Sequence, residues 1–510
     1  MTSQLYNTFK YGTSHKYGAT VLGTVEALSW AIEVDWDGDG VFDGVNEAFY
    51  LMKAPTIQRG RRNMLRPSGQ GFETLQTGKC NITLSNHDGR YDAWNTSSPL
   101  YPNVEAGKDV RVRVKDISTG VIYNRFYGII QDIEPSGYGA NAKVTIRCED
   151  AIRVLRDISI SATSPAAFGY SPTVTNCLEK LFQSINFPSR WGWTLDTNPD
   201  TIRIWYASGD RSVATELEDL ALSFLGYFFI SSAGMAIYYN RQSHTTSVET
   251  ISESEILKDI GNPQPWVIKR DVVKIIVHPR IFLNGEGFGV IVWLADYGEY
   301  PGIAAGNTLT FFIDYIYNGF PVYIEGSIAG TVWFATTLHG TIDFGLPTQY
   351  SGAVTNFGFS GKAAINNPNA VTVYFTRQAE NPSAYYSEFH GFASYNERTE
   401  TVSNPRDPTT LINPRQFVSS SMWYQDIDQA ATLADLLQPL LSAKNKTPII
   451  TFENRFSKQF TPDVFDVITL DVPTLGINSE DFRVGFIDEN PIGESTQAIR
   501  TTFYLEPFLS

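Results

Sequence analysis

Cysteine, histidine and basic residues are scarce in this 510-residue chain, and each shortage argues against a class of protein. The three cysteines are few and odd in number, so they favour small buried apolar residues over a disulfide framework. The six histidines are scattered, and the absence of HExxH, HxH and CxxC motifs argues against a zinc site. The net charge of −15 argues against tight nucleic-acid binding, which needs clustered cations.

Long apolar runs and the common catalytic motifs are also lacking. The longest apolar stretch, 225–239, is broken by Ser231, Ser232 and Gly234, so no transmembrane helix is predicted. The opening MTSQLYNTFKYG does not predict a signal peptide, so we expect synthesis in a host cytoplasm without export. Neither GxSxG nor GxxxxGK[ST] occurs, and we expect no enzyme. A glycosidase pair of carboxylates is defined by its separation in space and therefore stays open.

What is present favours a folded, β-rich protein of several domains. Aliphatic and aromatic residues make up 42% of the chain, and the length predicts roughly three to five domains. Val110, Val112 and Val114 alternate with charged residues, which is typical of a half-buried strand. About six such strands within 29–160, with no helix between them, predict an antiparallel barrel or sandwich.

The remainder of the chain alternates between helical and strand patterns. Residues 174–185 and 212–224 have helical periodicity, and a hairpin pattern follows at 227–239. Residues 281–394 contain only short strand patterns, which predict an inserted β-sandwich. A third helix is predicted at 426–441, with further strands after it.

One acidic loop matches the spacing of a calcium site. Asp35 to Asp43 has the pattern DxDxDGxxD, which supplies oxygen ligands at the positions that a Ca²⁺ loop uses. Asn46 occupies position 12, so the usual bidentate glutamate is missing. An acidic hairpin turn without a metal stays open as the alternative. The candidate ligands are Asp35, Asp37, Asp39, Asp43 and the backbone carbonyl of Val41.

Arginine is concentrated in one place only. Arg59, Arg61, Arg62 and Arg66 form the single dense basic cluster. A contact with phosphate or DNA is one interpretation of it. We favour a second interpretation, a solvated or subunit-facing loop that pairs with acidic neighbours, because the chain as a whole is acidic.

A long stretch resembles a known family. Residues 71–102 read GFETLQTGKCNITLSNHDGRYDAWNTSSPLYP, which predicts a strand, a turn and a loop packed down by Trp94 and Tyr101. Followed by EAGKDVRVRV, this stretch resembles the opening domain of the tail-hub (minor tail, baseplate hub) proteins of tailed bacteriophages. Two later stretches resemble further domains of that family, namely GYFFISSAGMAIYYNRQ after the second helix and DVFDVITL followed by FRVG near the C-terminus.

The resemblance implies a mainly β fold with α+β parts. It implies two tail-tube-like antiparallel β-barrel domains, an α/β second domain and an inserted β-sandwich. The implied divisions are an N-terminal arm at 1–28, a first barrel at 29–160, an α+β domain at 161–270, a second barrel from 271–280 plus 395–510 with its helix at 426–441, and the sandwich at 281–394.

The implied function is structural. The chain would form a homotrimeric hub at the tail tip of the virion and join the tail tube to the tip or central fibre proteins. It would close or gate the DNA channel, and phage DNA would pass without specific binding. Two alternatives stay open: a Ca²⁺-dependent adhesin that binds host glycans, and a tail-associated hydrolase of cell wall or polysaccharide.

Overall fold

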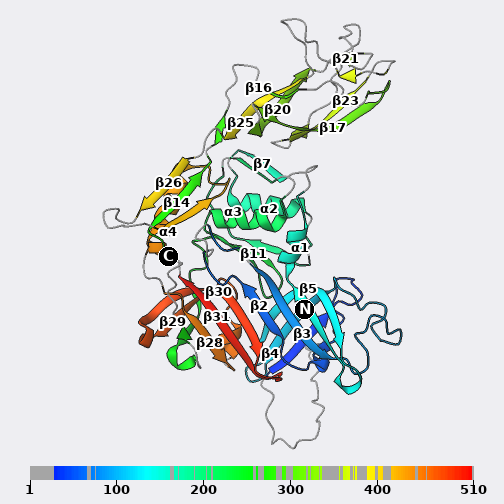
Figure 1. Ribbon diagram of the computed structural model, residues 1–510, viewed down its shortest axis with the longest axis vertical. Coiled ribbons are helices and arrows are strands. Elements are labelled where there is room, and N and C mark those ends of the chain that lie inside the picture. The colour runs from blue at the N-terminus through cyan, green and yellow to red at the C-terminus, as the bar shows by residue number, and fades with distance from the viewer. Residues whose placement is uncertain are drawn as a thin grey trace, which may run out of the picture.

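The computed structural model describes most of the chain outside its start and its inserted region. It describes 28–256, 260–261, 269–278 and 415–507, with short gaps at 66–70, 75, 161–165, 171, 186, 189, 203, 208–210, 443–445 and 455, and separate short segments between 280 and 405. The predicted N-terminal arm therefore lies outside the described residues except for Leu28. Figure 1 shows the large sheet at one end, a helical layer in the middle and small sheets at the far end, which confirms a mainly β fold.

The large sheet has twelve strands and is built from both ends of the chain. We call one part the N-terminal half-sheet. In sheet order it contains β1 (Leu28–Val34), β4 (Asp109–Asp116), β5 (Ile122–Ser136), β6 (Lys143–Glu149), β3 (Gln76–Ser85) and β2 (Thr56–Gly60). The C-terminal half-sheet contains β30 (Ile477–Pro491), β31 (Ile499–Pro507), β28 (Ile449–Glu453), β13 (Ile260–Gly261), β29 (Val467–Val472) and β12 (Ser247–Ser252).

The strands that we predicted for two barrels are thus joined in one sheet. β2 pairs with β30 in antiparallel register, with Ile57 opposite Glu489 and Gly60 opposite Phe486. We call this pairing the seam. The β-rich class is confirmed, whereas closed barrels are not: among the described strands the sheet order runs from β1 to β13 without closing.

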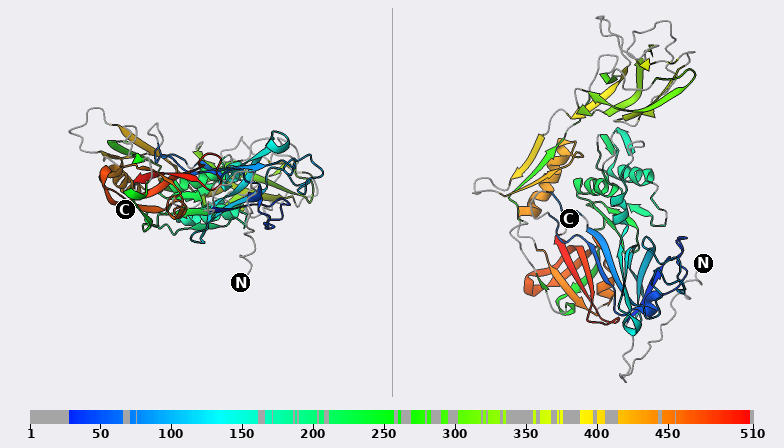
Figure 2. Two further views of the ribbon diagram at one scale, coloured as in Figure 1. Left: turned by 90° about the horizontal axis from the view of Figure 1, so that it is seen from below. Right: turned by 45° about the vertical axis from the view of Figure 1, so that its right-hand side comes forward.

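The middle layer is an α/β unit that covers the sheet (Figure 2). Its α3 begins where Ser212 accepts a hydrogen bond from the backbone of Thr215, which is the N-cap that the sequence predicts. The predicted helices at 174–185 and 212–224 are confirmed within one or two residues. The unit contains α1 (Ala151–Asp157), β7 (Ala166–Tyr170), α2 (Val174–Ser184), β8 (Trp193–Leu195), β9 (Ile204–Ala207), α3 (Val213–Ser223), β10 (Tyr227–Ile230) and β11 (Ala236–Tyr239).

A separate three-stranded sheet connects the inserted region to the body. It contains β14 (Val272–Val277), β26 (Glu400–Pro405) and β27 (Gln416–Ser420), and α4 (Ile427–Ser442) packs on it. We expected 271–280 to join the C-terminal barrel, but β14 pairs with β26 and β27 instead. Pro439 lies inside α4, which continues past it to Ser442.

The inserted region contains only strands among its described residues. They form small antiparallel sheets, and the predicted β-sandwich stays a prediction. The strands are β15 (Arg280–Phe282), β16 (Val290–Leu294), β17 (Thr308–Asp314), β18 (Ile316–Tyr317), β19 (Phe320–Pro321), β20 (Tyr323–Thr331), β21 (Phe334–Ala335), β22 (Thr355–Asn356), β23 (Ser360–Asn366), β24 (Tyr374–Phe375) and β25 (Glu388–Asn396).

Two large hydrophobic cores pack against the sheet, and their members do not follow the division into half-sheets. The core of the N-terminal half-sheet includes Phe460 and Ile499, which belong to the C-terminal part of the chain. Phe460 ends the short helix α5 (Phe456–Phe460). The C-terminal half-sheet shares one continuous core with the α/β unit. The two ends of the chain are therefore interlocked, since each supplies side chains to the other.

Candidate functional site

The predicted calcium loop follows β1 directly. Asp35 is buried, and its backbone N–H donates to the carbonyl of Asp109 at 3.0 Å. Carboxylate oxygens of Asp35, Asp37 and Asp39 lie within 4.8 Å of one another, a separation that suits ligands of one cation. Asp43 is not in that group. The structure thus brings three of the predicted ligands together.

Some carboxylate oxygens of this loop already accept hydrogen bonds from the protein. The two oxygens of Asp35 accept hydrogen bonds from the backbones of Gly38 and Gly40, each at 2.8 Å. A Cβ atom built on Gly38 would lie 3.3 Å from the ammonium of Lys108, so a cationic side chain lies beside the loop. Desolvation, followed by hydrogen bonding to Asp35, raises the pKa of Asp37 above its usual value.

Glu47 ties the calcium loop to the stretch that carries the family resemblance. Its fully buried carboxylate accepts from the indole N–H of Trp36 at 3.0 Å and from the hydroxyl of Tyr91 at 2.6 Å. Arg90 adds an ion pair at 3.2 Å. Burial, and then the charge of Glu47, raises the pKa of Tyr91 far above its usual value. Glu47 therefore ties two loops together, and no motif in the sequence indicated that role.

The loop from Asn86 to Pro102 is ordered by its own side chains. Asn86 accepts from the backbone of Tyr91 at 2.9 Å, and the Ser98 hydroxyl donates to the carbonyl of Arg90 at 2.6 Å. The predicted packing role of Trp94 and Tyr101 is wrong, because their side chains are 90% and 49% exposed. Tyr91 is the buried aromatic residue instead.

The arginine cluster lies at the seam and pairs with acidic neighbours. Arg59 forms an ion pair with Asp463, and Arg61 forms a two-pronged pair with Glu506 at 2.8 and 2.9 Å. The guanidinium of Arg62 lies 4.9 Å from the ring centre of Phe486. The predicted pairing with acidic neighbours is therefore confirmed for Arg59 and Arg61, but a solvated loop is wrong for them because both residues are buried. Arg66 lies outside the described residues.

The seam also depends on a close backbone approach. Gly60 has a φ of +100°, which disfavours residues with a side chain. A Cβ atom at Gly60 would lie 2.2 Å from the carbonyl oxygen of Gly485. The next residue, Arg61, donates its backbone N–H to that same carbonyl at 2.8 Å. The two half-sheets can therefore meet at this distance only with glycine at position 60.

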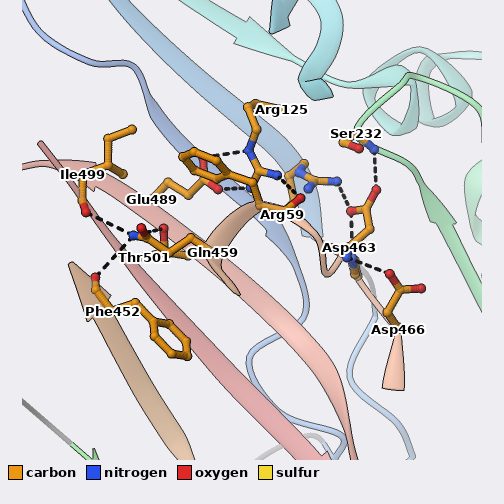
Figure 3. Close-up of polar contacts among 12 residues, drawn as sticks. Arg59, Arg125, Ser232, Phe452, Gln459, Asp463, Asp466, Glu489, Ile499 and Thr501 are labelled. Carbon is orange, nitrogen blue, oxygen red and sulfur yellow. Dashed lines mark hydrogen bonds and ion pairs between the residues drawn. The ribbon is translucent and has the colours of Figure 1, made fainter. Parts of the chain in front are cut away.

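Asp463 joins three units at the seam (Figure 3). Its carboxylate contacts Arg59 of the N-terminal half-sheet and accepts from the backbone of Ser232, in the β10–β11 turn, at 2.8 Å. Burial alone would raise its pKa, but Arg59 and the backbone donors outweigh burial and lower it. Nearby Asp466 accepts from the backbone of Asp463, and burial raises the pKa of Asp466 to about 6.

A second polar cluster joins the N-terminal half-sheet to the C-terminal part of the chain (Figure 3). Arg125 of β5 pairs with Glu489 of β30 and donates to the carbonyl of Phe460 at 3.0 Å. Gln459 donates to the carbonyl of Ile499 at 3.1 Å. Each of these polar side chains is almost fully buried. The sequence did not indicate this cluster, because Arg125 is more than 300 positions away from its partners Phe460 and Glu489.

The described residues offer little else for chemistry. Within them, the Asp35, Asp37 and Asp39 group is the single cluster of possible metal ligands, and the three cysteines are free and buried, as expected. A cavity of about 400 Å³ lies between α3 and β27, and its lining mixes apolar side chains such as Phe72, Leu222 and Ile276 with serines. No helix in the described part of the chain is long and apolar enough to cross a membrane.

Comparisons with known proteins find matches among solved structures. No protein-family model matches the chain, and no curated protein does. Among solved structures, it is similar to the 43 kDa tail protein of prophage MuSo2 from Shewanella oneidensis, with a TM-score of 0.49, 10% identity, and 94% of this chain and 98% of that chain covered. It is also similar to a tail protein from Neisseria meningitidis MC58, with a TM-score of 0.49, 11% identity, and 94% and 96% covered.

A third similar structure is prophage tail protein gp18 from Listeria monocytogenes EGD-e, with a TM-score of 0.43, 8% identity, and 93% and 94% covered. All three are tail proteins, and two of them are named as prophage proteins. The sequence resemblance is to tail-hub proteins of bacteriophages, and these three similar structures are also named as tail proteins.

Proposed function

We propose that this chain is a structural component of a phage tail and forms a trimeric hub at its distal end. The observation that carries the proposal is the twelve-stranded sheet, in which the two predicted tube-like regions meet at the seam. Buried ion pairs between distant parts of the chain hold the seam together. Such an interlocked body suits a part that transmits load between a tube and a fibre.

The resemblance to tail-hub proteins implies the trimer, and the two half-sheets of each chain support it. Each chain would offer two similar β-rich units to the tail axis, so three chains would match a sixfold tube. The hub would join the tail tube to the tip or fibre proteins and close the channel before DNA leaves. A net charge of −15 suits a channel wall that repels phosphate, along which DNA passes without specific binding.

Immunogold electron microscopy of purified virions tests the location. Antibody against this chain should place gold at the tail tip. Gold on lateral fibres would favour the adhesin alternative, and no gold on opened particles would contradict a virion role. Light scattering on the hub released from tails should give three times the 56.9 kDa mass of the chain.

We also propose that the hub has no catalytic role. Zymography on host cell wall and capsular polysaccharide should give no clearing with the purified chain. Clearing that disappears after substitution of one carboxylate would contradict this proposal and support the hydrolase alternative.

We propose that the loop from Asp35 to Asp43 binds Ca²⁺, because three of its carboxylates share one small volume. Calorimetry should detect binding to the wild-type chain and at least a tenfold weaker affinity in an Asp37→Asn, Asp39→Asn variant. Asp88→Asn, an exposed change in the neighbouring loop, is the control and should bind normally. Equal affinity in all three proteins would leave the loop as an acidic turn.

A further inference from the structure

Exposed apolar side chains gather at one end of the N-terminal half-sheet. Trp94 and Tyr138 are 90% and 91% exposed, which is unusual for large aromatic residues on an ordered protein. The exposed apolar side chains in this region include Val41, Val45, Met52, Trp94, Tyr101 and Tyr138. We call the surface formed by the loops at 35–53, 86–108 and 136–143 the loop end.

Strand register shows that these three loops share one end of the sheet. Val34 pairs with Val110, so the calcium loop starts beside the beginning of β4. Ser85 and Ser136 both pair with Lys143, so the long loop and the β5–β6 turn start together. The backbone of Met52 donates to the carbonyl of Thr83 at 3.0 Å and brings the first loop to the same place.

Buried hydrogen bonds and an ion pair link the three loops of the loop end to one another. Glu47 binds Trp36, Tyr91 and Arg90, which come from two of the three loops. The third is linked to the second by a bond from the backbone of Asn86 to the carbonyl of Ala142 at 2.9 Å. Aromatic side chains on a fixed base lose little entropy on binding, and Trp and Tyr are the residues that contribute most in protein interfaces.

The charge around these apolar residues is acidic. Asp37, Asp39, Asp43, Asp88 and Glu105 are all exposed. These loops also contain four cations: Arg90 pairs with Glu47, Lys108 pairs with Glu105, and Lys53 and Lys143 leave the five exposed acids in excess. The loop end therefore combines exposed apolar side chains with an excess of exposed carboxylates, and it is complementary to a surface that presents apolar residues together with lysine or arginine.

We propose that the loop end is a docking surface for a different tail protein whose contact face is apolar at its centre and basic at its rim. A symmetric contact between two copies of this chain would put the acidic surface against itself, which like charges oppose. The proposal rests on the proposed function, because it takes the partner to be a neighbouring component of the tail.

Zero-length cross-linking of intact virions tests the proposal directly. Carbodiimide joins a carboxylate to a lysine amine with loss of water, so a cross-linked peptide identifies the partner by its lysine. Virions are first probed with antibody against this chain; if the chain is absent from them, the proposed function itself fails. If it is present, we expect cross-links from Asp88, Glu105 or the calcium loop to lysines of another tail protein.

Oxidative labelling of Trp94 and Tyr138 gives a second readout. Labelling of Trp94 and Tyr138 should fall at least fivefold in virions relative to the isolated chain. Met235, which is exposed on the β10–β11 turn of the α/β unit, is the internal reference for this comparison. Unchanged labelling of Trp94 and Tyr138 would overturn the proposal. Cross-links from the loop end to lysines of a second copy alone would also overturn it.

Variants separate docking from folding and from calcium binding. Trp94→Ala with Asp88→Lys should reduce incorporation into virions at least tenfold, and it should change thermal unfolding little, because both side chains are exposed and Asp88 accepts one exposed hydrogen bond, from the backbone of Arg90 at 3.2 Å. Val248→Ala, an exposed apolar change on β12, is the matched control and should assemble normally. Neither Trp94 nor Asp88 belongs to the calcium loop, so the effect should persist in EGTA. Normal incorporation of the double variant would contradict the proposal.

Discussion

The two halves of the large sheet differ in how their cores are completed. The N-terminal half-sheet is nearly contiguous in sequence, yet its core is completed by Phe460 and Ile499 from the other end of the chain. The C-terminal half-sheet needs no such insertion and instead shares its core with the α/β unit. Sequence contiguity therefore does not make a half-sheet independent, because the last part of the chain has to fold before the first core is complete.

The largest expected effect comes from breaking the buried ion pair that crosses the N-terminal half-sheet. Arg125→Met leaves Glu489 as an unpaired charge in the interior and should lower the free energy of unfolding by about 3–5 kcal/mol. Urea unfolding of the purified chain measures the loss.

The double variant Arg125→Met, Glu489→Leu is the control for this prediction. It removes both charges and should recover most of the stability, since an apolar pair of similar volume can replace a buried ion pair. A single variant that loses less than about 1 kcal/mol, as exposed pairs do, would show that the interior tolerates the free carboxylate.

The second prediction makes the same substitution, isoleucine to alanine, in each of the two cores. Ile499 and Ile487 are both fully buried on neighbouring strands, but Ile499 belongs to the first core and Ile487 to the second. Either change to alanine should cost about 2–5 kcal/mol. Hydrogen exchange should become faster mainly in β1–β6 for Ile499→Ala and mainly in β28–β31 and the α/β unit for Ile487→Ala. Identical exchange patterns in the two variants would mean that the cores unfold as one.

The third prediction uses pH at Asp150, which lies between β6 and α1 and contacts β3. Asp150 accepts from the backbones of Gly78 and Ile152, and burial raises its pKa to about 7. The folded state thus holds a proton that the unfolded state releases near pH 4, so stability should fall as pH rises from about 4 to 7 and stay level above that.

Asp150→Asn removes this titration and keeps an oxygen acceptor for the helix cap. The difference in unfolding free energy between wild type and variant should therefore change by roughly 1 kcal/mol per pH unit between pH 5 and 7. Urea unfolding at four pH values measures it. A difference that does not vary with pH would contradict a raised pKa at Asp150.

Local patterns in the sequence predicted the elements but not their partners. Alternation in β3 and β4 and the Ser212 cap of α3 depend on neighbouring residues, so they could be read directly. The seam could not, because the pairing of Ile57 with Glu489 joins residues more than 400 positions apart. The same limit explains why β14 was expected in the C-terminal barrel.

In the candidate site too, local patterns were predictable from the sequence and contacts between distant residues were not. The calcium loop is a local pattern, and three of its carboxylates do lie together. The pairing of the arginine cluster with acids followed from net charge, but its burial did not, since burial depends on Asp463 and Glu506 returning from the far end of the chain. Glu47 gave no signal because its three partners become neighbours only after folding.

The smallest expected effect tests whether burial, and not the number of ion pairs, determines how much an arginine contributes to the free energy of unfolding. Arg147 on β6 contacts both Asp132 and Glu134, so it makes more ion pairs than Arg125, but its side chain is 53% exposed. Water solvates these charges whether or not they are paired, and salt screens them. Arg147→Ala should therefore change the free energy of unfolding by less than about 1 kcal/mol, and less still in 1 M salt. A loss comparable to that of Arg125→Met would mean that this outer face is covered in the folded protein, which light scattering of the purified chain would reveal as association.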